Sequence, residues 1–262
     1  MGPAKFEEMA QTKEVRVAQP GCPLSRNKVS SFIMIEIVSA TRMTQGDFWN
    51  KSPLGLSLKR LANDTRLAPY IVYENQRGLP EIFNGRITAQ TRYEILVFVH
   101  DDVWIDDYFL ADRVIEGLKT YDVIGVAGNR RRVKNQPAWA FKSLLDGKFT
   151  WDEKANLSGS VAHGTHPFGA ISCYGSVPAE CELLDGAFLA AKKSPLTDHG
   201  AVFDPEFDFH FYDMDFCRCA RKNGLRLGTW PICLTHQSSG GFNSPTWHDK
   251  LRLYQKKWEV ET

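Results

Sequence analysis

The sequence contains no stretch of 18 or more apolar residues, so no transmembrane helix is expected among its 262 residues. Its first segment, MGPAKFEEMAQTKEVRV, lacks the apolar centre of a secretory signal. The segment also misses the myristoylation pattern, because Phe6 stands where serine or threonine is required. These absences predict a cytoplasmic protein whose thiols are reduced.

Charge and cysteine patterns exclude two further classes. The net charge of +1 gives no electrostatic reason to expect a nucleic-acid partner. The six cysteines are scattered and form no C-x-x-C pair, which argues against a structural zinc site. The CRC segment at Cys217 to Cys219 is interpreted as core packing, since unpaired cysteine is often buried. No internal repeat or low-complexity tract occurs.

The composition, 43% hydrophobic and 24% charged, fits one large globular domain built from two merged halves. Residues 1–28 are polar and aperiodic, and we interpret them as a tail or an edge addition. A first half is expected over residues 29–128 and a second half over residues 129–243. Residues 244–262 contain a closing amphipathic helix, with Trp247 on its apolar stripe.

The first half alternates short apolar runs with segments of helical period. This rhythm is typical of an α/β fold with a mostly parallel sheet and flanking helices. Strands are expected at 32–40, 69–75, 94–99 and 122–128. Helices are expected at 47–63, 78–91 and 105–121, and Ser52-Pro53 is an N-cap and first-turn pair.

Polar residues follow three of these strands. They are His100-Asp101-Asp102 after the third, Ser39 to Arg42 after the first, and Glu74 to Gly78 after the second. In such sheets ligands bind beyond the carboxyl ends of the strands, so these segments are expected to converge on one crevice. Two adjacent carboxylates repel each other, which predicts a positive partner there.

The second half is less regular. Residues 129–182 are interpreted as loop-rich, and a strand over 181–194 is interrupted at Asp185-Gly186. Residues 204–228 are expected to enter a helix that ends near Gly224. A last strand then leads to His236 and a loop rich in serine and glycine.

Four motifs in this order resemble a known family. FVHDDVWI, LLDGAF, HFYDMDFCRCARKNGLRLG and LTHQSSGG look like the family 2-type glycosyltransferases of the GT-A fold, closest to a small bacterial branch. The resemblance covers roughly residues 30–258. It implies an inverting transfer from a nucleotide sugar, a divalent cation, and a role in making bacterial surface polysaccharide.

The resemblance also implies a metal site. The family's DxD motif falls on His100-Asp101-Asp102, where His100 departs from the pattern and Asp102 matches the metal-binding position. His236 matches a histidine that often completes the site, so Mn²⁺ or Mg²⁺ would be held by Asp102 and His236. The alternatives are an acidic loop that caps the next helix and a histidine with an ordinary hydrogen bond.

The remaining roles are assigned residue by residue from the same resemblance. Asp213 would be the catalytic base, whereas Asp215 lies about 200° further around the helix and is interpreted as a dipole-stabilising acid. The acceptor would bind Asp185, Gly186 and Tyr212, of which Tyr212 replaces a family glutamate. The nucleotide sugar would contact six residues: Thr41, Arg42, Glu74, Asn75, Asp101 and Asp102.

These assignments predict a metal-dependent transferase that moves a sugar from a nucleotide diphosphate sugar, with a UDP-sugar as the expected donor, to a hydroxyl of a glycan or glycolipid. Two alternatives stay open: a metal-dependent sugar-nucleotide hydrolase or nucleotidyltransferase, and a catalytically silent sugar-nucleotide-binding protein. A nucleotidyltransferase would carry a glycine-rich, lysine-bearing loop after its first strand, which SATRMTQGD does not match. Peripheral contact with the inner face of a membrane, through the closing helix, is also left open.

Overall fold

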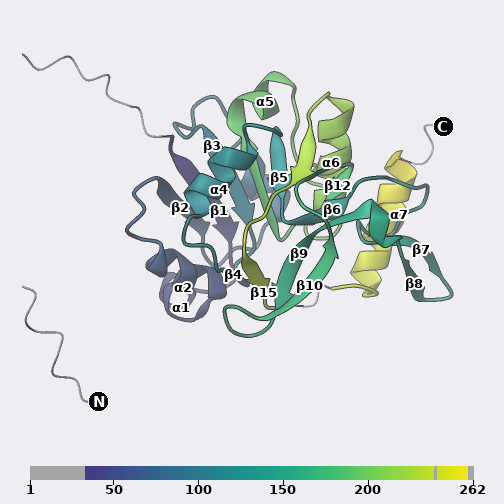
Figure 1. Ribbon diagram of the computed structural model, residues 1–262, viewed down its shortest axis with the longest axis horizontal. Helices are drawn as coiled ribbons and strands as arrows, with labels where there is room; N and C mark the ends of the chain where they lie inside the picture. The colour runs from purple at the N-terminus through teal and green to yellow at the C-terminus, as the bar shows by residue number, and fades with distance from the viewer. Residues whose placement is uncertain (1–32, 239–240, 259–262) are drawn as a thin grey trace, which may run out of the picture. The chain divides into compact units, whose positions relative to one another are not determined.

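In the computed structural model of the chain, a central sheet of seven strands has the order β11-β14-β5-β13-β3-β1-β2 (Figure 1). Strands β1, β2, β3, β5 and β14 run in one direction, and β13 and β11 run in the other. The expected α/β architecture with a mostly parallel sheet is therefore confirmed. The strand bounds are Ile35–Ala40 (β1), Leu67–Val72 (β2), Ile95–Val99 (β3), Val123–Gly125 (β5), Ala179–Cys181 (β11), Phe188–Lys192 (β13) and Leu227–Thr229 (β14).

The structure describes residues 33–238 and 241–258, which all belong to one compact unit spanning Phe32–Thr262. The expected tail over 1–28, the cysteine at position 22, and residues 239 and 240 of the Ser/Gly loop lie outside the described residues. Within the described ranges, no helix is long and apolar enough to cross a membrane.

Seven α-helices and one 3₁₀ turn surround the sheet in the described part of the chain. Their bounds are Gln45–Lys51 (α1), Pro53–Arg60 (α2), Leu79–Asn84 (α3), Leu110–Gly117 (α4), Lys193–Asp198 (α5), Tyr212–Lys222 (α6), Pro245–Trp258 (α7) and Lys154–Asn156 (η1). The helix expected over 47–63 is two helices. The Ser52 side chain accepts from the backbone N–H of Gly55, so Ser52 and Pro53 begin α2 as predicted.

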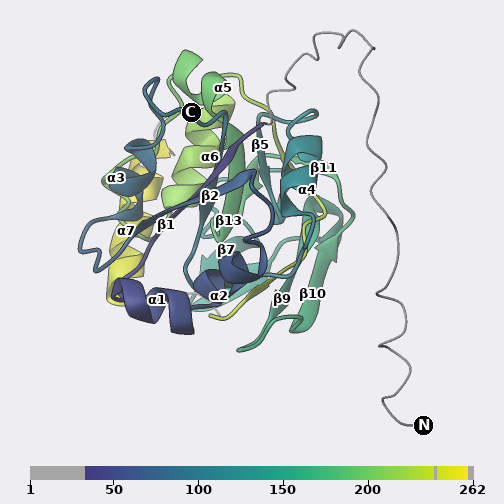
Figure 2. The same cartoon turned by 90° about the vertical axis from the view of Figure 1, so that its left-hand side faces the viewer.

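Side-chain alternation along the strands decides which helices cover each face. Phe98 of β3 points to one face, where its ring lies 4.9 Å from that of Phe83 in α3. Phe203 contacts both Phe98 and Phe216, so α6 covers the same face. Ile124 of β5 occupies the opposite register and lies beneath Gly117 of α4. Figure 2 shows α4 on one side of the sheet and α3 and α6 on the other.

A second sheet has the order β12-β6-β9-β15-β4, with β10 paired to β9, and β7 and β8 form a separate hairpin. The bounds are Val103–Ile105 (β4), Ala127–Asn129 (β6), Phe141–Leu145 (β7), Lys148–Trp151 (β8), Leu157–His163 (β9), Ala170–Gly175 (β10), Leu183–Leu184 (β12) and Leu234–His236 (β15). The interpretation of 129–182 as loop-rich was therefore incomplete. The strands within residues 129–182 mix small, polar and aromatic residues, so the alternation of apolar and polar residues that predicts a strand is hard to recognise in the sequence.

Two expected helices are shorter than their sequence pattern indicates. The helix expected over 78–91 ends at Asn84, whose side chain bonds the backbone of Phe203. The helix expected over 105–121 begins only at Leu110, because Val103–Ile105 pairs with β15 instead. Backbone pairing with a distant strand overrides the local helical pattern there.

The closing helix α7 packs on the body through its predicted apolar stripe. Trp247, Leu251 and Tyr254 are buried, and the Tyr254 ring lies 5.4 Å from that of Phe211. Figure 1 shows α7 beside the β7–β8 hairpin. Trp247 also contacts Phe149 of β8, at 5.6 Å between ring centroids. This packing places α7 and the hairpin around one cavity.

Candidate active site

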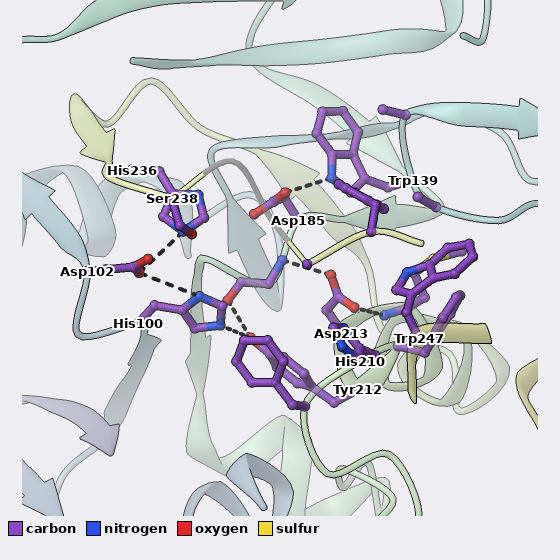
Figure 3. Close-up of a pocket in the computed structure, with 18 of the residues that line it drawn as sticks. His100, Asp102, Trp139, Asp185, His210, Tyr212, Asp213, His236, Ser238 and Trp247 are labelled. Atoms are coloured by element: carbon purple, nitrogen blue, oxygen red, sulfur yellow. Dashed lines mark hydrogen bonds and ion pairs between the residues drawn. The ribbon is translucent and has the colours of Figure 1, made fainter. Parts of the chain in front are cut away.

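A cavity of about 650 Å³ lies beyond the carboxyl end of β3. Its lining includes most of the residues that the sequence singled out: Asp101, Asp102, Asp185, Gly186, Tyr212, Asp213 and His236. Figure 3 shows Asp102 and His236 turned toward each other from separate elements, with Asp185 and Asp213 in the same pocket. The residues that follow β3 therefore line the crevice that was expected beyond the strand ends.

Antiparallel pairing of β4 with β15 brings Asp102 and His236 together. His236 is in register with Val103, and the backbone N–H of Gln237 donates to the Asp102 carbonyl at 3.0 Å. As a result Nε2 of His236 lies 3.3 Å from Oδ1 of Asp102. Nδ1 of His100 lies 3.9 Å from the same oxygen, so a third side chain joins the pair.

Among the described residues, His100, Asp102 and His236 form the one group whose possible ligand atoms all lie within 4.8 Å of each other. Oδ1 of Asp102 is buried and, apart from the ion-pair contact of 3.3 Å with Nε2 of His236, forms no hydrogen bond with any described residue. A buried carboxylate oxygen without a hydrogen bond is costly unless a cation satisfies it. One carboxylate and two imidazoles also suit a divalent transition cation, so these residues fit a metal ion.

The electrostatics of the group favour an ionised Asp102. Burial by itself would raise the pKa of Asp102, but the adjacent imidazoles, His236 first, hold it below the ordinary value. Burial likewise opposes the charged form of His236, but Asp102 raises the His236 pKa. For His100 burial prevails and lowers the pKa, which favours the neutral imidazole that metals bind.

Asp213 begins α6 and faces the same cavity. Its Oδ2 accepts from the backbone N–H of Gly186 at 3.0 Å, and its Oδ1 accepts from that of Met214 at 2.9 Å. Burial, with a contribution from the charge of Asp185, raises the pKa of Asp213 to about 7. A carboxyl with that pKa can take up and release a proton near neutral pH.

Gly186 connects Asp213 with Tyr212. The Tyr212 hydroxyl donates to the Gly186 carbonyl at 2.7 Å, while the Gly186 N–H donates to Asp213. A Cβ at position 186 would lie 2.6 Å from the Tyr212 hydroxyl oxygen and 2.7 Å from Cβ of Asp213. Only glycine fits this approach, which explains why the turn after β12 carries it.

Asp185 is held rigidly at the cavity wall. Its Oδ2 accepts from the indole N–H of Trp139 at 2.7 Å, and its Oδ1 accepts from the backbone N–H of Ala187 at 2.8 Å. Trp139 comes from the segment before β7, so Asp185 joins the two sheets to the hairpin. The predicted acceptor position is thus a fixed, hydrogen-bonded carboxylate on the cavity surface.

Asp215, which the sequence assigned to helix stabilisation, lies outside the cavity lining and is 1% exposed. Its Oδ1 accepts from the indole N–H of Trp258 at 2.7 Å and pairs with the Lys257 ammonium at 2.8 Å. Burial raises the pKa of Asp215, although both partners oppose this. Asp215 therefore anchors α7, and it is turned away from Asp213.

The predicted contacts to the nucleotide sugar lie in two groups. Asp101 lines the cavity, and burial raises its pKa although Thr41 opposes the shift. The loops after β1 and β2 are joined by hydrogen bonds from the Glu74 N–H to the Met43 carbonyl and from the Asn75 N–H to the Thr41 carbonyl. This pairing brings Thr41, Arg42, Glu74 and Asn75 together, beside the cavity lining and not within it.

Several cavity residues were missed at the level of sequence. His100, a departure from the family motif, lines the cavity, and His163, from the segment expected to be loop-rich, lies on β9 in register with His236. An aromatic wall, also missed, is formed by Trp139, Phe141, Trp151, Tyr174, Phe242 and Trp247. Aromatic residues over 139–151 and at 174 were the available signal, but nothing local indicates that they share a surface.

No family model matches the sequence, and no curated protein is similar to it in sequence. Solved structures with similar folds include TarS 1-349 of S. aureus, which is 12% identical over 87% of this chain and 66% of TarS 1-349, with a TM-score of 0.45. The mannosyltransferase PcManGT from Pyrobaculum calidifontis was solved with GDP-Man and Mn²⁺. It is 12% identical over 85% of this chain and 61% of its own chain, with a TM-score of 0.43.

The catalytic domain of Drosophila beta1,4galactosyltransferase 7, solved with xylobiose, is also similar. It is 11% identical over 84% of this chain and 79% of its own, with a TM-score of 0.40. This chain spans less than two thirds of TarS 1-349 and of PcManGT, at 66% and 61% of their lengths. Of the three proteins, one is named as a mannosyltransferase and one as a galactosyltransferase.

Proposed function

We propose that the chain is a metal-dependent, inverting glycosyltransferase that uses a nucleotide diphosphate sugar, with UDP as the first nucleotide to test. One observation carries the proposal: a metal-ligand group and a carboxyl with a pKa near 7 face the same cavity. Figure 3 shows His100, Asp102 and His236 gathered together and Asp213 apart from them, across the view. Sugar transfer needs these two functions at separate places, one for the leaving group and one for the acceptor.

The charges around the cavity support a cation as part of the site. Among the described residues no lysine or arginine lines it, whereas four carboxylates do: Asp101, Asp102, Asp185 and Asp213. Within this lining, a departing nucleoside diphosphate therefore meets no fixed cationic side chain. When bound, a divalent cation such as Mn²⁺ supplies positive charge to the diphosphate oxygens. Asp102 and His236 would hold that cation.

Asp213 serves as the base for the acceptor. Its carboxylate takes the proton from an acceptor hydroxyl, the hydroxyl oxygen forms a bond to the anomeric carbon, and the bond from that carbon to the diphosphate breaks. A base with a pKa near the working pH combines a useful fraction of the ionised form with adequate basicity. The two backbone N–H groups, of Gly186 and Met214, keep the carboxylate oriented.

The aromatic wall supports a carbohydrate acceptor, either a glycan or the sugar portion of a glycolipid. Trp151 is 53% exposed and stacks on Tyr174 at 6.1 Å between ring centroids, with 24° between the planes. Trp139 meets Tyr174 edge to face at 4.9 Å. Flat, exposed aromatic faces pack against the apolar C–H face of a pyranose. Asp185 supplies a hydrogen-bond acceptor for a sugar hydroxyl at the edge of this wall.

The test is a nucleotide-release assay with a panel of UDP- and GDP-sugars and Mn²⁺, each with and without an oligosaccharide mixture. The proposal predicts release that requires acceptor, is lost with a chelator, and is abolished in Asp102→Ala. Release of equal size without acceptor would identify a hydrolase instead. Binding of a donor without any turnover, and unchanged in Asp213→Asn, would identify a silent sugar-nucleotide-binding protein.

A further inference from the structure

The two positions at which the sequence departs from the family motifs are in contact. Nε2 of His100 lies 2.7 Å from the hydroxyl of Tyr212, although the residues are 112 positions apart in the sequence. The resemblance places acidic residues at both positions. A histidine and a tyrosine that replace two acids and then bond each other indicate one coupled change.

The direction of the hydrogen bonds identifies the tautomer of His100. The Gly186 carbonyl oxygen can only accept, and it lies 2.7 Å from the Tyr212 hydroxyl, which therefore donates its single proton there. The Tyr212 oxygen must then accept from Nε2–H of His100. A neutral imidazole protonated at Nε2 carries its lone pair on Nδ1.

The Nδ1 atom of His100 points toward the metal-ligand group. It lies 3.9 Å from Oδ1 of Asp102, the buried oxygen that has no hydrogen bond with any described residue. The ring has little freedom to turn away, because the Phe209 ring stacks on it at 5.8 Å and 22°. The lone pair is thus presented at the same place as the nitrogen of His236 (Figure 3).

We infer that His100 is a third metal ligand through Nδ1, and that Tyr212 is a positioning residue which fixes the tautomer this ligation needs. The inference rests on the proposed function, in which Asp102 and His236 hold the cation. Two imidazoles and one carboxylate form a softer donor set than the all-oxygen set that Mg²⁺ prefers. The site therefore selects Mn²⁺ or another transition cation over Mg²⁺.

The presence of His100 and Tyr212 at two positions where the family motifs carry acids also has an electrostatic consequence. His100 contributes a neutral imidazole and not a carboxylate to the proposed ligand set, so a bound cation would retain more positive charge for a diphosphate. The neutral Tyr212 phenol, in place of a glutamate, adds no further carboxylate beside Asp213, which already has Asp185 nearby. Both replacements make the cavity less negative at the points where negative charge collects during transfer.

The experiment measures Mn²⁺ affinity by electron paramagnetic resonance of the free ion, with Mn²⁺ alone and with added UDP. Tyr212→Phe removes the acceptor for Nε2–H, and His100→Gln keeps a side-chain amide near Tyr212 but lacks Nδ1. Loss of a group that orients a ligand typically weakens metal binding by about 10- to 100-fold. We expect a loss of that size in Tyr212→Phe and at least as large a loss in His100→Gln. Tyr174→Phe, which removes another hydroxyl from the same cavity, is the matched control for metal affinity.

A spectroscopic readout on the wild-type protein guards against variants that fold poorly. Pulsed measurements of nitrogen coupling to bound Mn²⁺ should show two imidazole ligands in the wild type and one in His100→Gln, and excess Mg²⁺ should not displace the Mn²⁺. If wild type binds Mn²⁺, His236→Ala loses it, and both the His100 and Tyr212 variants bind normally, the inference is wrong while the proposed function stands. If wild type binds no Mn²⁺ even with UDP, both are overturned.

Discussion

The raised pKa of Asp213 makes its effect on stability depend on pH in a defined direction. The folded protein holds this proton more tightly than the unfolded chain, because burial moves the pKa from 3.8 to about 7. The stability that this proton contributes is fully present below the pKa that Asp213 has in the unfolded chain. It is lost as the pH rises through the pKa that Asp213 has in the folded protein. Asparagine cannot ionise, so Asp213→Asn removes this loss.

The magnitude follows from the shift. A change of roughly three units corresponds to about 4 kcal/mol at most, at 1.36 kcal/mol per unit. We take half of that, about 2 kcal/mol, because the carboxylate borders an open cavity. The variant should therefore gain about 2 kcal/mol of unfolding free energy relative to wild type between pH 4.5 and pH 8.

Urea unfolding of both proteins at several pH values measures this difference. Asparagine also loses one of the two backbone hydrogen bonds to Gly186 and Met214, but that cost is the same at every pH and cancels from the slope. In the wild type, kcat/KM should rise with pH and level off above about 7. A free-energy difference that stays flat across the range would refute the assignment of a raised pKa to Asp213.

Three other substitutions test separate parts of the structure. Gly186→Ala should destabilise the fold by about 2 kcal/mol through overpacking against Tyr212, and it should abolish activity; wild-type melting would contradict the close approach seen in the structure. Lys257→Met should cost about 2 kcal/mol in urea unfolding, because the buried Asp215 loses its cation, whereas the exposed neighbour Lys256→Met should be neutral. Trp151→Ala should raise the acceptor KM by about tenfold with little change in kcat or melting temperature, and an unchanged KM would remove Trp151 from the acceptor site.

The first half of the fold could be predicted from sequence because each of its elements carries a local signal. Short apolar runs mark β1 and β3, and the Ser52-Pro53 pair marks the start of α2. The carboxyl ends of parallel strands share an edge, so the position of Asp102 followed from the order of strands and helices alone. The predicted boundaries of helices and strands were wrong where contacts with a distant segment determine them. The pairing of β4 with β15, for example, shortens the helix that follows β4.

The second half and its share of the site depend on contacts that leave no local pattern. The motif resemblance pointed to Asp213 and His236, but it treated His100 and Tyr212 as isolated departures. Their contact appears only when α6 folds against the end of β3, where the Tyr212 hydroxyl bonds both His100 and the Gly186 carbonyl. The aromatic wall was missed for the same reason, because its residues come from the hairpin, β10, α7 and the loops beside them.

The measurement that tests the central claim most directly is anomalous scattering from a crystal soaked with Mn²⁺ and UDP. The account predicts a manganese peak in the cavity, bound by Oδ1 of Asp102 and Nε2 of His236, with the UDP phosphates on its open side. A cavity that holds UDP without manganese at those two side chains would contradict it.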